Sequence, residues 1–524
     1  NASYDQTHLL VASQDSIRLL NTNTLKQKSI CGIEDMFQIN TLFYDHKREV
    51  VWIGTSTDGL FYLDMKKKTL LPFSNFPKQP IAVITESSDS TLLVGIDGQG
   101  VWELDKDKKK VLNILKEDID NPFSLRGDGV YDIFCDGQQR VWVTTYTGGL
   151  SFFDWKSPLI NQITHQVNNP NSLGNDNVNK ILEDSKGDIW FATNNGISRW
   201  RVATNEWDTY YQNKQEQAQV FLALCEDDEG NIWAGSFSSG FYVLDRNTGK
   251  ELVHYPRNTS DLKSDGKFIM NIYKDSEGDI WIGGIQDVIC YLTKEKRFHT
   301  YGAQPMRTFM EFSPGKMLLA CTYSVLLLDK ETGKITFLPE CLAQDILVMG
   351  DDIWVATSGD GLLHHNYTTR ETHKITVESG LPSNYVNSVM YDNGYLWLGT
   401  ENGLCRYNPA DSTVHAYYST LALSSASFNV NASCKLRNGE LMWGTNNGAV
   451  MFNPDKLYHT QLNGEIYFQN ITISGSSIRE NQDLLRGIPV NKQTDISFKY
   501  DQNTLTLEVL PIGVSSKEIK FSWK

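Results

Sequence analysis

The sequence contains no run of apolar residues long enough to cross a membrane, which takes about 18 residues. Its apolar stretch Val220-Phe221-Leu222-Ala223-Leu224-Cys225 has only the length of a buried strand. The sequence also lacks a signal peptide. Because the chain opens in the middle of a repeated phrase, we expect it to be a piece of a longer protein, so the missing leader does not define its compartment.

The sequence also lacks an excess of basic residues. It has 48 Lys and Arg against 63 Asp and Glu, a net charge of -15. Because binding to phosphates needs a basic face, this balance argues against a nucleic-acid partner. It also fits poorly with a highly sulfated, polyanionic ligand.

Cysteine pairs with redox or zinc spacing are absent. The eight cysteines are scattered, and no two have CxxC spacing. Cys135, Cys225 and Cys405 lie inside apolar strand phrases, so we expect buried thiols rather than disulfides. Cysteine usage does not define the redox compartment.

Catalytic motifs are missing as well. The sequence has no HExxH, GxSxG, P-loop or dinucleotide fingerprint. The adjacent His364 and His365 would point to opposite faces of a strand, and we expect surface histidines rather than metal ligands. The sequence therefore predicts no catalytic residue, no metal site and no cofactor in this chain.

What the sequence does contain is one phrase repeated eleven times. Each copy has an apolar pair around a tryptophan or an apolar substitute, a small residue, Thr or Ser, a polar turn with Gly, and a second apolar run. The spacing of about 43 residues is that of a four-stranded propeller blade. The central position of the phrase, the Trp slot, falls at Leu10, Trp52, Leu93, Trp142, Trp190, Trp233, Trp281, Leu319, Trp354, Trp397 and Met442.

A single copy predicts the strands of one blade. Residues 178–182 alternate apolar and polar and predict an inner strand, and 184–188 predict a tight turn. Residues 189–193, 197–200 and 207–211 predict the other three strands. We expect the Trp slot to pack between neighbouring blades, and the small residue after it to leave room where blades crowd together.

The repeat count predicts an all-β fold with tandem β-propellers, because one propeller usually has about four to eight blades. We place an incomplete N-terminal propeller of about four blades at residues 1–171 and a seven-bladed propeller at 172–460. Residues 461–524 predict the start of an Ig-like β-sandwich, with strands at 465–468, 471–473, 496–500, 505–510 and 521–523.

The phrase Asp-x-x-Gly-x-Ile-Trp-x-Gly-Thr-x-x-Gly-Leu-x-x-Tyr resembles the repeats in the periplasmic sensor regions of Bacteroides-type hybrid two-component systems. Residues 184–200, 275–292 and 392–407 carry the resemblance, and the final strands look like that family's three-tyrosine domain. The resemblance implies two seven-bladed propellers and a sandwich in the periplasm, followed by a membrane segment, a histidine kinase, a receiver and a DNA-binding module. Eleven repeats rather than fourteen depart from the family pattern.

The resemblance further implies a sensing module that binds an oligosaccharide released from a polysaccharide and controls genes for glycan use. The intact receptor would form a homodimer and be attached to the inner membrane through a segment after this chain. The kinase itself lies outside these residues, so the chain is not expected to be an enzyme.

Candidate ligand-binding residues lie in the turns between the second and third strands, which open on one face of a propeller. Sugar binding calls for aromatic faces and for amide or carboxylate groups that bind hydroxyls. The candidates are Tyr146, Asn194, Phe237, Gln286, Tyr323, Asp360 and Asn402.

Two alternatives remain open at the level of sequence. The chain could be a propeller-type polysaccharide lyase or hydrolase, which would need a converging acid–base pair. It could also be a propeller scaffold that binds only proteins. Neither the glycan nor the place of its site can be named from the sequence.

Overall fold

We describe the chain from a computed structural model. The structure describes residues 2–512 apart from 14–15, 34–37, 122–123, 137–139, 155–159, 213–219, 257–267, 286, 303–304, 418–426, 458–464, 481–484, 486–488, 493–494, 501 and 503. The chain divides into two compact units, residues 1–157 and 158–524.

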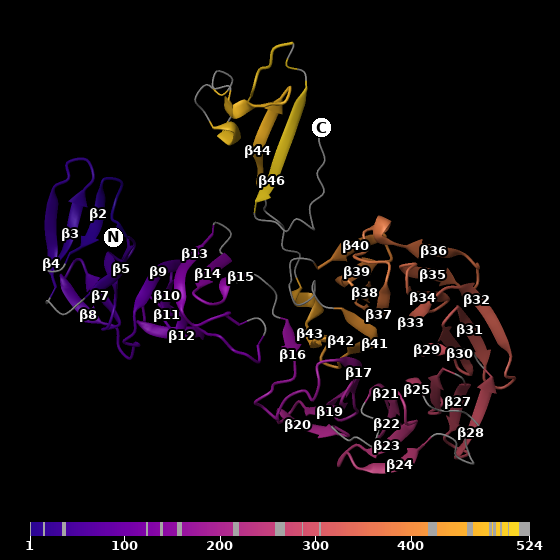
Figure 1. Cartoon of the computed structure of the whole chain (residues 1–524). Helices are drawn as coiled ribbons and strands as arrows, with labels where there is room; N and C mark the ends of the chain where they lie inside the picture. Colours follow the sequence, from indigo (N-terminus) through magenta and orange to yellow (C-terminus); the bar gives the residue numbers. More distant parts are fainter. Residues whose placement is uncertain are drawn as a thin grey trace. The chain divides into compact units, whose positions relative to one another are not determined.

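The first unit contains four antiparallel sheets built from consecutive strands. Three of the sheets have four strands, and the last has three among the described residues. Figure 1 shows these sheets following one another as an arc. The strands are β1 (Ala2–Ser3), β2 (His8–Ala12), β3 (Ser16–Asn21), β4 (Gln27–Gly32); β5 (Ile39–Asp45), β6 (Val50–Thr55), β7 (Leu60–Asp64), β8 (Thr69–Pro72); β9 (Ile81–Ser88), β10 (Thr91–Ile96), β11 (Gly100–Asp105), β12 (Lys110–Leu115); and β13 (Val130–Cys135), β14 (Arg140–Thr145), β15 (Gly149–Asp154).

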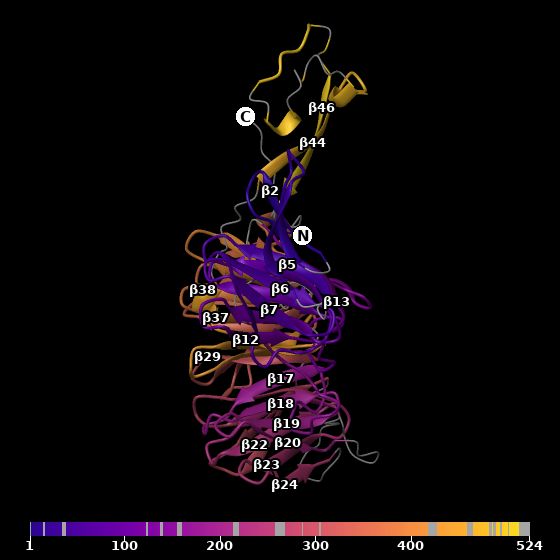
Figure 2. The same ribbon diagram turned by 90° about the vertical axis from the view of Figure 1, so that its left-hand side faces the viewer.

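The second unit contains a closed ring of seven four-stranded sheets. In Figure 1 the first strand of each sheet lies nearest the centre of the ring, and Figure 2 shows the ring edge-on. The first six blades are β17 (Val178–Glu183), β18 (Ile189–Thr193), β19 (Gly196–Arg201), β20 (Glu206–Tyr210); β21 (Phe221–Glu226), β22 (Asn231–Ser236), β23 (Phe241–Asp245), β24 (Glu251–Tyr255); β25 (Ile269–Lys274), β26 (Ile280–Gly284), β27 (Asp287–Leu292), β28 (Arg297–Gly302); β29 (Met306–Ser313), β30 (Lys316–Cys321), β31 (Ser324–Asp329), β32 (Ile335–Glu340); β33 (Ala343–Met349), β34 (Asp352–Thr357), β35 (Leu362–Asn366), β36 (Thr372–Ile375); and β37 (Val386–Asp392), β38 (Tyr395–Thr400), β39 (Gly403–Asn408), β40 (Thr413–Ala416).

The seventh blade closes the ring with a strand from the other end of the unit. It consists of β41 (Phe428–Lys435), β42 (Leu441–Thr445) and β43 (Gly448–Phe452), and its outer strand is β16 (Asn161–Ile163). The sequence places the start of this propeller at residue 172, so β16 lies ahead of the expected boundary. The repeated phrase could not reveal this strand, because its three residues carry no part of the phrase and lie ahead of the first inner strand of the ring, which begins at Val178.

The turn between the first two strands explains the repeated Asp-x-x-Gly sequence. Asp184 Oδ1 accepts the backbone N–H groups of Lys186 and Asp188 at 2.9 and 3.0 Å, and Gly187 has a φ of +87°. Asp184 Oδ2 accepts the indole N–H of Trp190 at 2.9 Å, so one carboxylate both holds the turn and orients the tryptophan. The same indole-to-carboxylate bond recurs in Trp142 to Asp136, Trp233 to Asp227 and Trp281 to Asp275.

The Trp slot is buried in ten of the eleven repeats. Trp190, for example, packs against Phe221 and Leu224 of the next blade. The residue two positions later is small for the same reason, since a Cβ on Gly399 would lie 3.0 Å from the Cβ of Phe428 in the next blade. The predicted packing of the slot between blades is therefore confirmed at these ten positions.

Trp142 is the exception, and there the prediction is wrong. Trp142 is only half-buried, and its cross-strand neighbours Phe134 and Phe152 are 64% and 58% exposed. These side chains lie on the face of β13–β15 that would meet a following blade. Among the described residues of the first unit, no sheet follows β15 to cover that face.

The last strands of the chain form the start of the β-sandwich. β44 (Glu465–Ile473) pairs with β45 (Ser476–Ser477) and with β46 (Leu505–Ile512). The two strands expected between 465 and 473 are one strand with a register shift, and the strand at 505–510 is confirmed. Residues 496–500 form no strand; Ile496 and Phe498 instead pack on the apolar side of the sheet. Residues 521–523 lie outside the described residues.

Helical structure is scarce. The four 3-10 helices have three residues each, and no helix in the described part of the chain could span a membrane. All eight cysteines are free. Cys225 and Cys405 are buried, as expected, whereas Cys135 is half-buried. The helices are η1 (Val377–Ser379), η2 (Pro454–Lys456), η3 (Ile478–Glu480) and η4 (Val490–Lys492).

Candidate ligand-binding face of the closed propeller

One face of the closed ring gathers two kinds of loop from every blade. After the second strand of a blade, the first turn residue donates its N–H to the carbonyl just before the inner strand, as in Phe237 to Val220 and Thr322 to Pro305, both at 2.9 Å. The hairpin between strands two and three therefore lies beside the loop that leads into the blade. We call this side of the ring the loop face.

The structure places five of the predicted residues on the loop face. They are Asn194, Phe237, Tyr323, Asp360 and Asn402, each in the hairpin after the second strand of its blade. Gln286 lies outside the described residues, and Tyr146 belongs to the first unit. The positions of these five residues do not by themselves show ligand contact.

Two of the five are already used to hold the fold. Asn194 Oδ1 accepts the side-chain amide of Asn179 at 2.9 Å. Asn402 donates its backbone N–H to Thr400 Oγ1 at 3.1 Å and its side-chain amide to Pro382 O at 3.4 Å. These hydrogen bonds fix the hairpins, so both residues are weaker candidates for a ligand.

The aromatic candidates are exposed. Tyr323 has 70% of its surface exposed, and Phe237 has 46%, with its ring centroid 4.9 Å from that of Phe268. In the first unit Tyr146 is 61% exposed and lies edge-on to Tyr131 at 5.4 Å. Exposed aromatic faces are the groups on which sugar rings can stack.

The inner strands contribute a further set of residues that the sequence did not single out. In six inner strands the register shifts after the first residue, which leaves one bulge residue per blade next to the loop face. Asn179 and Asn387 use this position to bridge blades, donating their side-chain amides to Phe221 O at 2.9 Å and Phe428 O at 2.8 Å.

Arg307 and Gln344 occupy the same bulge position in the fourth and fifth blades without making that bridge. Arg307 is exposed, and its guanidinium has no hydrogen bond or ion pair with a described residue. Gln344 Oε1 is buried and also has no hydrogen-bond partner in the described part of the chain. A buried polar atom without a partner is costly, so Gln344 Oε1 would gain from a donor on a ligand, and the Arg307 guanidinium is exposed to one.

The fourth and fifth blades, and the loop that leads into the sixth, carry further exposed side chains of the loop face. The hairpin of the fifth blade meets the loop leading into the sixth, where Ser358 forms a β-bridge with Tyr385, which is 47% exposed. Asp360, in that hairpin, accepts Lys374 Nζ at 2.8 Å. We define the candidate site as Arg307, Tyr323, Gln344, Asp360 and Tyr385.

An acidic cluster elsewhere in the ring looks like a metal site but contains its own cation. Carboxylate oxygens of Asp275, Glu277 and Asp279 lie within 4.8 Å of one another. Lys330 Nζ lies 2.7, 2.6 and 2.8 Å from these three residues. The ammonium group takes the place that a metal ion would need, so the cluster is an ion-pair network.

The tandem histidines are not both at the surface. His365 is 4% exposed, with Nδ1 2.8 Å from Thr372 Oγ1, whereas the ring of His364 stacks on Trp354 with centroids 4.1 Å apart. The expectation of surface histidines is wrong for His365, because the inward face of the third strand packs within the blade.

Comparison with known proteins gives the family of the repeats. The sequence pattern of the two-component regulator propeller matches residues 172–195, 215–238, 263–286 and 380–402. The chain carries two-component regulator propeller repeats. These regulator repeats coincide with the phrase that resembles Bacteroides-type sensor regions, and all four matches fall in the second unit.

Relatives and solved structures agree with the regulator repeats. Histidine kinase P4 of Formosa agariphila is 26% identical over 301 residues, which cover 51% of this chain. The extracellular domain of the hybrid two-component system BT3049 from B. thetaiotaomicron has a TM-score of 0.68 at 20% identity and covers 96% of this chain. The extracellular domain of BT4673 from the same organism has a TM-score of 0.50 at 18% identity, covering 96% of this chain and 70% of that one.

The chain spans only part of these proteins. The match covers 22% of the length of the curated histidine kinase and 68% of the BT3049 domain. The chain therefore matches only part of each of these proteins, and the structural likeness shows the shared propeller fold.

Proposed function

We propose that this chain is the extracytoplasmic sensing module of a hybrid two-component histidine kinase and that it binds a polysaccharide-derived oligosaccharide. The observation that carries the proposal is the candidate site, where the exposed rings of Tyr323 and Tyr385 share the loop face with the Arg307 guanidinium and the Gln344 amide. The regulator repeats support the receptor part of the proposal, since they coincide with the ring that holds this site.

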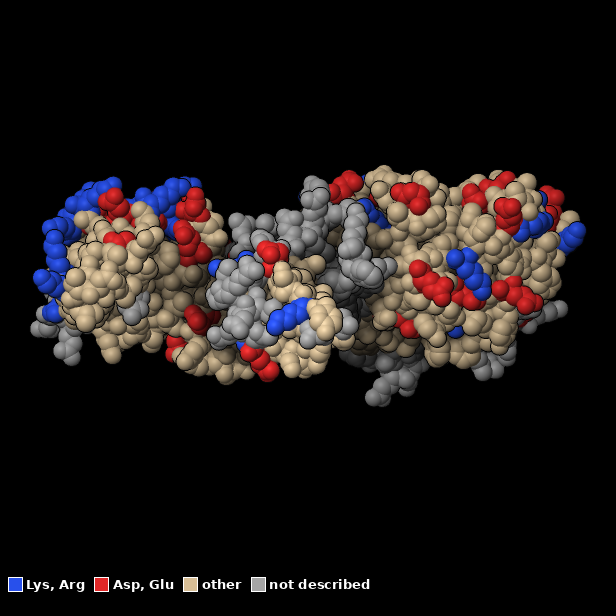
Figure 3. Space-filling view, turned by 90° about the horizontal axis from the view of Figure 1, so that it is seen from above, with Lys and Arg blue, Asp and Glu red and all other residues tan. Residues whose placement is uncertain are grey.

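The chemistry of the site suits a neutral or weakly charged sugar. Tyr323 and Tyr385 offer exposed rings for stacking on pyranose faces. Arg307 and Gln344 offer a guanidinium and an amide for hydroxyl groups, and Asp360 offers a carboxylate. On the rim of the second unit seen in Figure 3, acidic and basic side chains alternate over the described residues, which does not favour a polyanion.

The rest of the proposed receptor lies outside this chain. We place the module in the periplasm, joined to the inner membrane by a segment after the sandwich and acting as a homodimer. Ligand binding would change the kinase activity and, through a phosphorelay, the transcription of glycan-utilisation genes. No catalytic residue, metal or cofactor has a part in the binding step proposed here.

The proposal is tested by calorimetric titration and thermal-shift measurements against plant, host and microbial oligosaccharides, with the sugars recovered and analysed by chromatography. We expect one glycan class to bind, to raise the melting temperature and to be recovered unchanged. Tyr323→Ala should weaken binding roughly fivefold, because an aromatic contact is worth about 1 kcal/mol.

Phe337→Ala is the matched control, because Phe337 is 66% exposed, like Tyr323, but lies on the outer strand β32. It should leave the affinity unchanged. Equal effects of the two substitutions would contradict the placement on the loop face. A cleaved sugar would instead indicate a lyase or hydrolase, and failure of all glycans with capture of a protein would indicate a scaffold.

A further inference from the structure

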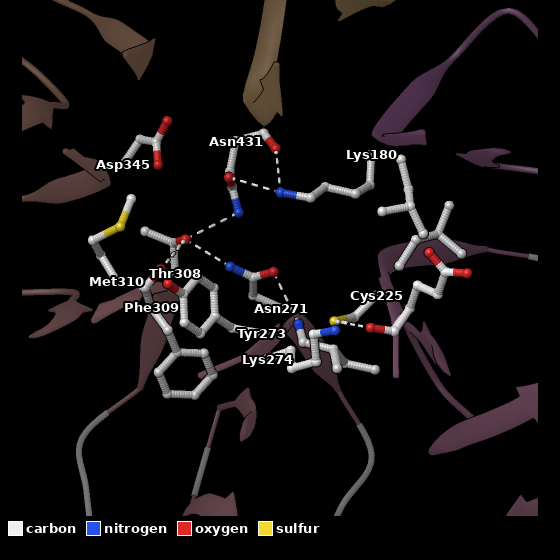
Figure 4. A pocket seen from close by; sticks show the side chains of 14 residues that line it. Lys180, Cys225, Asn271, Tyr273, Lys274, Thr308, Phe309, Met310, Asp345 and Asn431 are labelled. Carbon is white, nitrogen blue, oxygen red and sulfur yellow. Dashed lines mark hydrogen bonds between the residues drawn. The ribbon is translucent and has the colours of Figure 1, made fainter. Parts of the chain in front are cut away.

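A cavity follows the axis of the closed ring and does not include the candidate site of the loop face. Its volume is about 400 Å³, and it is lined by inner-strand residues of β17, β21, β25, β29, β33 and β41. In β17, β25, β29 and β33 the lining begins at the residue after the bulge, and in the first three of these strands it continues toward the opposite end. Figure 4 shows Lys180, Asn271, Thr308, Asp345 and Asn431 around this space.

Lys180, Asn271, Thr308 and Asp345 occupy equivalent positions in four blades, each directly after the bulge. The register shift of an inner strand re-aims the side chain that follows it, here toward the axis. Ala223 stands at the same position in the second blade. Five of the six bulged inner strands of the ring carry a polar residue at this position, the fifth being Ser388, and the other four line the cavity, which gives its wall a mixed set of hydrogen-bonding groups.

One side of the cavity is rich in hydrogen-bond donors. Lys180 Nζ donates to Asn431 Oδ1 at 3.0 Å and to Asn431 O at 3.1 Å. The side-chain amides of Asn271 and Asn431 both donate to Thr308 Oγ1, at 2.6 and 3.1 Å. The ammonium and both amides therefore each keep one N–H for which the described residues provide no acceptor.

The other side of the cavity holds a buried carboxylate. Asp345 is 6% exposed, and its two oxygens accept the backbone N–H groups of Ile346 at 2.9 Å and Val389 at 3.0 Å. Burial raises the pKa of this carboxyl to about 6, and burial lowers the pKa of the Lys180 ammonium. In the described structure the two charges form no direct ion pair, and each retains capacity for a further partner.

The charged residues at the far end of the cavity are already satisfied. Lys274 Nζ lies 2.7 Å from Asp228 Oδ1. Glu226 accepts the backbone N–H of Ser185 at 2.7 Å and pairs with Arg246. The uncommitted groups of the cavity are therefore the donor side around Lys180 and, across from it, Asp345.

We infer that the axial cavity binds a small hydroxylated carboxylate of the size and chemistry of a sugar acid. The carboxylate of the ligand would accept hydrogen bonds from Lys180, Asn271 and Asn431, and a hydroxyl group of the ligand would donate to Asp345. A neutral sugar leaves the ammonium without a counter-ion, and a simple carboxylate leaves Asp345 without a donor. A volume of about 400 Å³ falls within the roughly 300–1,000 Å³ range of small-molecule sites.

The test compares D-galacturonate with D-galactose by calorimetric titration of the whole chain, because the two differ at one carbon. We expect galacturonate to bind at least roughly tenfold more tightly, since charge-assisted hydrogen bonds are stronger than neutral ones. The methyl ester of galacturonate, which removes only the charge, should bind like galactose. Acetate, which lacks hydroxyl groups, should bind weakly.

Substitutions then locate the site. Lys180→Met should abolish the preference for galacturonate over its methyl ester. Asp345→Asn should lower the affinity for galacturonate and for galactose to a similar degree. Tyr323→Ala on the loop face should change neither, which separates this cavity from the proposed oligosaccharide site.

Three results would overturn the inference: galacturonate does not bind, its ester binds equally well, or Lys180→Met binds like the wild type. If Lys180→Met fails to fold, the comparison of acid, ester and acetate on the unaltered chain still decides the ligand chemistry. A competition titration locates the galacturonate site. An oligosaccharide whose binding is weakened by Tyr323→Ala should bind equally well in the presence and absence of galacturonate.

Discussion

The open arc of the first unit and the closed ring of the second carry the same repeated phrase with different results. Trp281 in the ring and Trp142 in the arc each donate the indole N–H to an aspartate six residues earlier, at 2.8 and 3.0 Å. Trp281 is fully buried, whereas Trp142 is only half-buried. Local sequence thus builds the blade, but only a neighbouring blade turns the tryptophan into core.

Inner-strand positions show the same contrast. Asp345 in the ring and Asp132 in the arc both follow a bulge, and each accepts the next residue's backbone N–H at 2.9 Å. Asp345 is 6% exposed, and Asp132 is exposed. In the closed ring, the neighbouring blades therefore bury the aspartate at this position, and it lines the axial cavity.

The ring and the arc should differ most in the stability that each loses when the tryptophan of the Trp slot is replaced. Trp281→Ala should lower the free energy of unfolding of the ring by about 3–5 kcal/mol, because it removes a fully buried side chain and leaves Asp275 without the indole N–H. Trp142→Ala should cost about 1 kcal/mol, since much of that side chain is already in water. Urea denaturation followed by circular dichroism measures both values. Similar costs would show that the face of β13–β15 is covered in solution.

The second difference concerns pH. The pKa of Asp345 is about 6 in the fold against 3.8 for an ordinary aspartate, so its protonated form is favoured by folding. That contribution is complete below pH 4 and is lost as the pH rises through 6. Relative to Asp345→Asn, the wild type should lose about 2 kcal/mol of stability between pH 4 and pH 7.

Thermal melts across this pH range provide the measurement. Asp132→Asn is the matched control, since it changes an exposed side chain at the same position of the arc. If the melting temperatures of the wild type and Asp345→Asn changed with pH in parallel, water or a bound molecule would have to solvate Asp345 in the cavity.

The sequence predicted the blades well because their chemistry is local. The aspartate turn, the indole hydrogen bond and the Thr-to-Gly hairpin all lie within one copy of the phrase, as in Asp184, Trp190 and Thr193. The closing strand β16 was not predicted, because its three residues pair with β43 almost 300 positions away and carry no phrase of their own. The strand expected at 496–500 failed because burial of Ile496 and Phe498 was mistaken for strand pairing.

The candidate site could be predicted only in part. Turn chemistry pointed to the hairpins and so to Tyr323 and Asp360, and also to Asn194 and Asn402, whose side chains form hydrogen bonds within the fold. Arg307 and Gln344 were missed because a bulge is invisible in an alternating pattern. For the axial cavity a signal was present: Lys180, Asn271, Thr308 and Asp345 are four different polar residues at one position of the inner strand.

The smallest expected difference is at the small residue after the Trp slot. Six of the seven blades of the ring have Gly or Ala there, as in Gly399, and the fourth has Cys321, whereas the last blade of the arc has Thr144. A Cβ on Gly399 would lie 2.6 Å from Ser388 Oγ and 3.0 Å from Phe428 Cβ, so Gly399→Val should cost about 1–3 kcal/mol through overpacking.

Thr144→Val gives the same product residue at the matching position of the arc. It should change the free energy of unfolding by less than about 0.5 kcal/mol, because no blade presses on that face among the described residues of the first unit. Urea denaturation of the two variants measures the contrast directly. A Thr at this position already indicates that the end blade of the arc tolerates a larger side chain than any blade of the ring. If Thr144→Val proved as costly as Gly399→Val, a tightly packed partner would have to cover Trp142 and its neighbours, and the arc would be a closed structure like the ring.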